Sequence, residues 1–100
     1  MVIVVFQFST KPDMSKEYFQ EVEILQEEIK NEKGFISAER YKSNTDENSY
    51  VSISTWKDKK SVERWHNNKK HKVSQNKGKE RIFNSFRIRV AEVFKDYSFR

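Results

Sequence analysis

The chain has 100 residues, no cysteine and a formal net charge of +5. That length suits one small domain, and the lack of cysteine excludes disulfides, zinc–thiolate sites and cysteine nucleophiles. The apolar run at residues 2–8 is too short for a membrane span and has no basic segment before it, so a cytoplasmic protein is the simplest prediction.

The charge is unevenly spread along the chain. Residues 13–32 hold seven acids and two lysines, a net charge of −5, whereas residues 57–81 hold ten basic residues and three acids, a net charge of +7. A basic segment of this kind is compatible with nucleic-acid binding, but the exposed aromatic residues that would stack on bases are not interleaved with it. A solvated basic face is the simpler interpretation.

The first half of the chain predicts a strand, a helix and a hairpin. Residues 2–8 alternate as a strand with apolar residues on both faces. Residues 14–33 predict an amphipathic helix with Tyr18, Val22, Leu25 and Ile29 on one stripe, ended by Gly34. Residues 35–42 and 50–56 alternate as two further strands, with Phe35 and Tyr41 expected on one face of the first and Tyr50, Ser52 and Trp56 on one face of the second.

The second half predicts two helical segments and a last strand. Asp58 is expected to cap a short helix that ends near residue 67 and buries Trp65. Residues 69–81 form a very polar helical stretch, and residues 83–93 alternate as a fourth strand. The tail, residues 94–100, carries three aromatic side chains. This density predicts that the tail packs against another protein surface, with a partner subunit as the natural candidate.

This order of elements defines the predicted fold class. It is the β-α-β-β-α-β pattern of a ferredoxin-like α+β sandwich, and one such domain would occupy residues 1–100. One sheet face takes the helices. Because the first and last strands are apolar on both faces, the other sheet face needs a cover, and two sheets packed face to face would form a dimeric α+β barrel. We therefore expect a homodimer.

Several residues place the chain near a known family. They are Gly34-Phe35 at the start of the second strand, Ser54-Thr55-Trp56 followed by Asp58, Trp65 with His71, Gly78, and the closing run at residues 87–97. In these features the chain resembles the antibiotic biosynthesis monooxygenase family of small dimeric α+β barrels. The resemblance implies a pocket between sheet and helices in each subunit, and in some members a cofactor-independent oxidation of phenolic polyketides by dioxygen.

The resemblance implies roles for particular residues. His71 is the candidate general base that removes a phenolic proton, and Trp56 the second candidate catalytic residue, as a wall against a flat aromatic ligand. Trp65, Ser52 and Tyr50 are the candidate substrate-binding residues. In the best-matched oxygenase pattern an asparagine stands where this chain has Ser52, so the amide that would orient a substrate carbonyl is missing.

Other activities fit the residues less well. Haem-degrading relatives use an asparagine on the first strand, a tryptophan on the helix and a histidine beyond it; Trp65 fits, but the first strand has no asparagine and His71 follows Trp65 too closely. His66 and His71 are five residues apart, which misses the helical spacing of two metal ligands, and Gly34 and Gly78 form no phosphate-binding loop. The predicted reaction therefore uses no cofactor and no metal.

Two classes of function remain open. The first is a small cofactor-independent monooxygenase that acts on a phenol, quinol or similar small aromatic, with the substrate as the source of electrons. The second is a non-catalytic dimer that binds a small apolar ligand, in which Trp56 and Trp65 are packing residues. A nucleic-acid binder that uses the basic face at residues 57–81 is a weaker form of the second class.

Overall fold

The computed structural model describes residues 1–68 and 83–99, apart from the side chains of residues 21–26. Its elements follow the order β1 (Val2–Thr10), α1 (Ser15–Lys30), β2 (Phe35–Lys42), β3 (Ser49–Trp56), α2 (Lys59–His66) and β4 (Phe83–Glu92). The predicted ferredoxin-like β-α-β-β-α-β fold is confirmed. The predicted helix at residues 69–81 lies outside the described residues.

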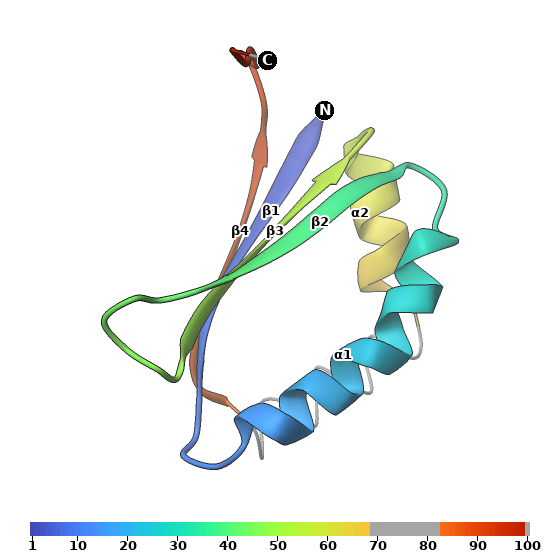
Figure 1. Cartoon of the computed structure of the whole chain (residues 1–100). Coiled ribbons are helices and arrows are strands. Elements are labelled where there is room, and N and C mark those ends of the chain that lie inside the picture. The colour runs from blue at the N-terminus through green and yellow to red at the C-terminus, as the bar shows by residue number, and fades with distance from the viewer. Residues whose placement is uncertain (69–82, 100) are drawn as a thin grey trace.

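The four strands form one antiparallel sheet in the order β2-β3-β1-β4, and both described helices lie on the same face of it (Figure 1). We call this side of the sheet the helix face and the other side the open face. Even-numbered residues of β1 and β3 share the helix face, because Val2 pairs with Trp56 and Phe8 pairs with Tyr50. On β4 the same face carries Phe86, Ile88 and Val90, as their pairing with β1 requires.

The predicted alternation of β2 is wrong beyond its first residue. Phe35 pairs with Trp56 but Ser37 pairs with Thr55, so Ile36 is an extra residue at a β-bulge. From Ala38 onward the strand is therefore in the opposite phase. Phe35 shares the helix face with Ala38 and Arg40, whereas Tyr41 lies on the open face.

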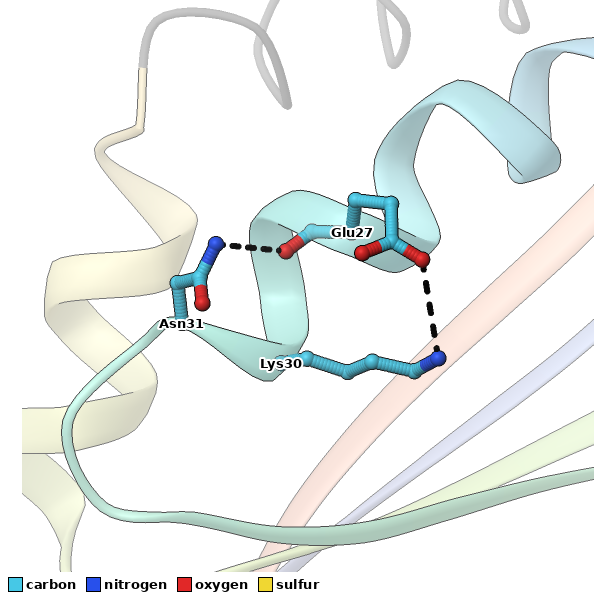
Figure 2. A network of polar contacts seen from close by, with 3 residues as sticks. All are labelled: Glu27, Lys30 and Asn31. Carbon is cyan, nitrogen blue, oxygen red and sulfur yellow. Dashed lines mark hydrogen bonds and ion pairs between the residues drawn. The ribbon is translucent and has the colours of Figure 1, made fainter.

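Helix α1 ends earlier than the sequence predicts. It stops at Lys30, and Asn31 closes it by donating from Nδ2 to the Glu27 carbonyl oxygen at 3.0 Å, while Lys30 Nζ lies 3.7 Å from Glu27 Oε1 (Figure 2). Gly34 does not end the helix; it lies four residues beyond it, with φ +91°. Of the predicted apolar stripe, Tyr18 is buried and Ile29 half-buried.

Aromatic rings form the main core at one end of the helix face. Phe8 is buried with four ring centroids around it, from Phe6 and Tyr18 at 4.7 Å to Phe83 at 5.3 Å and Tyr50 at 5.4 Å. The other end of the same face is closed by Trp56 and Val2. We call these the Phe8 end and the Trp56 end.

Outside the helix face, apolar side chains are exposed on the open face and in the tail. On the open face Tyr41 is 52% exposed and Ile53 36% exposed. In the tail after β4, Phe94 and Phe99 are almost wholly exposed and Tyr97 is largely so. Exposed aromatic side chains at this density are typical of surfaces that meet a partner.

Candidate functional site

Trp56 is the most enclosed large side chain among the predicted site residues. It is the last residue of β3, is 1% exposed, and meets the Phe35 ring edge-on at a centroid distance of 5.3 Å. Its indole Nε1 donates to Ser54 Oγ at 2.9 Å. The indole N–H is therefore satisfied inside the protein, and the Ser54 hydroxyl keeps its own proton for donation to another acceptor.

The Trp56 end is held by a close approach between two loops and α2. Lys57 N donates to the Gly34 carbonyl oxygen at 2.7 Å, and a Cβ on Gly34 would lie 1.8 Å from Ser61 Oγ. Asp58 caps α2 as predicted, since its Oδ1 accepts from Ser61 N at 2.9 Å and from Ser61 Oγ at 2.7 Å. These two hydrogen bonds lower the pKa of Asp58, because both favour its charged form.

Between the two packed ends lies a less covered strip of the helix face. Ser52 and Ser54 on β3 are half-buried, whereas Ile88 and Val90 on β4 are 43% and 53% exposed. Cross-strand pairing places these positions side by side through Val4 and Phe6 of β1. We call this the central strip: Val4, Phe6, Ser52, Ser54, Ile88 and Val90. It offers apolar surface with two hydroxyls, which suits a small, largely apolar ligand.

Tyr50 belongs to the Phe8 end. Its ring stacks on Phe8 at 19° and meets Phe19 edge-on at 5.6 Å, and its hydroxyl donates weakly to Ser15 Oγ at 3.4 Å. It lies one helix-face position along β3 from Ser52. Tyr50 is thus a packing residue that borders the central strip, and the structure brings it together with Ser52 and Trp56 on one strand face.

Arg40 is a residue of this region that sequence reasoning missed. The bulge at Ile36 turns Arg40 onto the helix face, directly opposite Ser52. Its Cζ lies 4.8 Å from the Phe19 ring centroid and 5.8 Å from that of Tyr18. Burial raises the pKa of Tyr18, and the positive charge of nearby Arg40 holds back part of that rise. In the sequence, Arg40 is only one of several charged residues in a predicted strand, and nothing there indicates which sheet face it occupies.

Of the two candidate residues that follow β3 in the chain, the structure describes Trp65 but not His71. Trp65 is buried on α2, as predicted, and α2 packs against β3. His71 lies outside the described residues, so its role as a base stays a prediction. His66, the other histidine, is exposed in the last turn of α2.

Two open depressions lie elsewhere on the surface. One is polar and lies at the turn between β2 and β3. The second lies at the adjoining end of the sheet and has a mixed lining that includes Phe8, Tyr50 and Phe86 as well as Gln7 and Arg87, so the predicted substrate-binding residue Tyr50 borders it. Neither contains Trp56 or Ser52. Within the described residues, no three His, Asp or Glu side chains are gathered as metal ligands would be. No helix in this part of the chain has the length and apolar character needed to cross a membrane.

Comparison with known proteins gives concordant matches. Residues 1–77 match the family model of the antibiotic biosynthesis monooxygenases. The chain is 32% identical over 93 residues to the jasmonate monooxygenase ABM of Pyricularia oryzae. That match covers 93% of this chain but 43% of the relative, so the chain spans less than half of the relative's length.

Solved structures match the fold over almost the whole chain. A putative antibiotic biosynthesis monooxygenase from Deinococcus radiodurans has a TM-score of 0.87 at 11% identity and covers 100% of this chain and 99% of its own. SnoaB, a cofactor-independent oxygenase from Streptomyces nogalater, has a TM-score of 0.82 at 15% identity, with 95% and 94% covered. At such identities the likeness concerns the fold alone.

Proposed function

The chain belongs to the antibiotic biosynthesis monooxygenase family, and from this membership we propose that it is a cofactor-independent monooxygenase that oxidises a small phenolic or quinol aromatic. One observation supports this proposal most directly. The central strip, with its two serine hydroxyls, remains accessible on the helix face between two packed ends, one of them closed by Trp56. A flat ligand would lie on this strip with one edge toward Trp56.

The proposed chemistry uses the substrate as its only source of electrons. A phenol becomes a quinone when one atom of dioxygen enters the ring and the other leaves as water, and the ring supplies all four electrons. His71 is the proposed base that removes the phenolic proton, since a phenolate passes an electron to dioxygen more readily than a phenol does. Ser54 would donate its free hydroxyl proton to a substrate oxygen, and Ser52 would line the strip beside it.

A second substrate class is supported by the curated relative. The name of that protein gives its substrate as jasmonate, which is a small apolar carboxylate rather than a phenol. The central strip suits the apolar body of either compound, because most of its surface comes from Val4, Phe6, Ile88 and Val90. Both classes therefore belong in the first substrate screen.

Oxygen uptake with a panel of phenols, quinols and jasmonate tests the proposal. We expect one class to drive uptake that is saturable in substrate and to quench tryptophan fluorescence over the same concentrations. His71→Ala should lower turnover at least about tenfold, within the range for acid–base groups, while His66→Ala serves as the matched control and keeps the activity. Quenching without oxygen uptake for every compound would instead favour a non-catalytic binding protein.

The assembly is also proposed to be a homodimer formed through the open face and the aromatic tail. Its support is the exposed apolar surface of Tyr41, Ile53 and Phe94, which a second copy would cover. Light scattering should then give twice the 12.1 kDa of one chain. A monomeric mass at micromolar concentration would contradict the dimer without affecting the proposed chemistry.

A further inference from the structure

Arg40 is placed where it can reach a ligand on the central strip. Because of the β2 bulge, its side chain leaves the sheet on the helix face, and its cross-strand partner is Ser52. Directly opposed residues have Cβ atoms about 5 Å apart, so the Arg40 side chain starts beside Ser52, and its guanidinium lies over the α1 rings of Phe19 and Tyr18. Without the bulge at Ile36, Arg40 would lie on the open face of the sheet.

The guanidinium lies over two rings of α1. Its Cζ lies 4.8 Å from the centroid of Phe19 and 5.8 Å from that of Tyr18. Among the side chains that the structure describes, no carboxylate forms an ion pair with it. Ring contacts of this kind orient the planar group through its faces and leave N–H donors at its edge, which is the geometry that binds a carboxylate bidentately.

The dimensions of the strip define the rest of the ligand. The row Arg40–Ser52–Phe6–Ile88 crosses all four strands, which is three strand spacings or about 14 Å. Beyond the Ser52 hydroxyl, the row is apolar. An acid group at one end and a ring system or short hydrocarbon at the other would match this order of surfaces.

We propose that Arg40, with Ser52 beside it, is the subsite that binds the carboxylate of a small apolar acid whose body lies on the central strip. This inference rests on the proposed function only for the location of the ligand. It makes the substrate an acid, so a hydroxylated aromatic acid satisfies both the phenol proposal and this subsite. Tyr18, whose ring centroid lies 5.8 Å from the Arg40 Cζ, would position the guanidinium rather than contact the ligand.

Equilibrium dialysis with a matched pair of probes tests the subsite. The pair is 6-hydroxy-2-naphthoate and its methyl ester, which share ring and phenol and differ in the negative charge. At neutral pH the wild-type protein should bind the acid at least about tenfold more tightly than the ester, as expected for a charge-assisted hydrogen bond. Arg40→Met should abolish this preference while leaving ester binding unchanged.

Two further variants make the test specific. Lys42→Met removes the next helix-face cation on the same strand and should keep the preference for the acid. Arg40→Lys keeps the charge but loses the two-pronged geometry, so an intermediate preference is expected. Thermal melts establish that each variant is folded.

Several results would overturn the subsite. They are equal binding of acid and ester by the wild-type protein, binding of neither probe at millimolar concentration, a preference that survives Arg40→Met, and an equal loss in Lys42→Met. Oxygen uptake is measured separately. A charge-dependent preference without oxygen uptake would leave the subsite standing while the proposed monooxygenase function fails.

Discussion

The two ends of the helix face are closed by different physical means. At the Phe8 end, rings from β1, α1, β3 and the start of β4 surround one phenylalanine, and the stabilisation comes from buried apolar area and ring geometry. At the Trp56 end, the buried Trp56 side chain lies beside segments held by hydrogen bonds and one close backbone approach. Lys57 N donates to the Gly34 carbonyl oxygen, Gly34 lies against Ser61, and Ser61 N donates to Asp58.

This difference predicts that the two ends respond differently to substitution. The Phe8 end depends on volume, so it should lose free energy in proportion to what is deleted. The Trp56 end depends on fit, so it should be sensitive to small additions and to the loss of single hydrogen bonds. The central strip lies between the two ends, and side chains from neither end cover Ile88 and Val90.

Phe8→Ala is expected to have the largest effect. Removing a buried ring that contacts four others should lower the free energy of unfolding by about 4 kcal/mol, within the range for phenylalanine-to-alanine changes. Urea unfolding measures this loss, and Phe8→Leu, which keeps most of the volume, is the control. A loss below about 1 kcal/mol would mean that the aromatic end does not carry the core.

Gly34→Ala tests the other end with an addition of one methyl group. The new Cβ would lie 1.8 Å from Ser61 Oγ and 2.6 Å from Ser61 Cβ, and the backbone has φ +91°, so we expect a loss of about 3 kcal/mol. Measured against Ser61→Gly alone, which removes the Ser61 hydroxyl, Gly34→Ala should lose only the part due to positive φ. An equal loss from Gly34→Ala in both backgrounds would show that the contact with the Ser61 side chain contributes nothing to it.

The sequence predicted the fold well wherever alternation is unbroken. In strands β1, β3 and β4, alternate residues point to opposite faces of the sheet without interruption through most of the strand. The sequence therefore predicts that Trp56, Ser52 and Tyr50 share one face. Strand β2 was misassigned because a bulge at Ile36 adds one residue without a polar or glycine signal there. That single residue decides which face carries Arg40, so this charged neighbour of the site could not be found from periodicity.

Other parts of the site depend on contacts between distant segments. The sequence indicates that Gly34 permits positive φ, but the approach of Ser61 arises from the packing of α2, and no local pattern predicts it. Likewise, Ser54 and Trp56 share a face by strand period, whereas the hydrogen bond between them requires the particular rotamer that Trp56 adopts when enclosed. Local pattern therefore indicated the candidates, and tertiary packing determined their partners.

Ser54→Ala is expected to have a moderate effect. It leaves the buried indole N–H of Trp56 without its partner, which should cost about 1–2 kcal/mol of unfolding free energy and shift the tryptophan emission. Ser52→Ala, on the same face of the same strand, is the matched control and should change stability by less than about 0.5 kcal/mol. Equal effects of the two variants would contradict the view that the Trp56 end depends on single hydrogen bonds.

Asp58→Asn should have the smallest effect, and one that depends on pH. Because hydrogen bonds from Ser61 hold the folded-state pKa of Asp58 below its ordinary value, its charge stabilises the fold above that ordinary pKa, and the contribution is lost as the pH falls through the folded pKa. The variant should therefore melt below the wild type at neutral pH, and the difference should shrink as the pH falls through the lowered pKa.

Asp46 gives the matched comparison at the opposite end of the sheet. Its carboxylate accepts from Asn48 N and from Ser49 Oγ, and these bonds lower its pKa in the same direction. Asp46→Asn should thus show a similar dependence on pH, but it lies in the β2–β3 turn rather than beside Trp56. The wild type should shift its tryptophan emission as the pH falls through the folded pKa of Asp58, because the Asp58 cap holds Ser61, and with it Gly34, against the Trp56 end. Asp58→Asn has no carboxyl group to titrate there and should lose this shift, whereas Asp46→Asn should keep it. Loss of the shift in both variants would show that the two ends of the helix face are coupled through the sheet, which would contradict their separate closure.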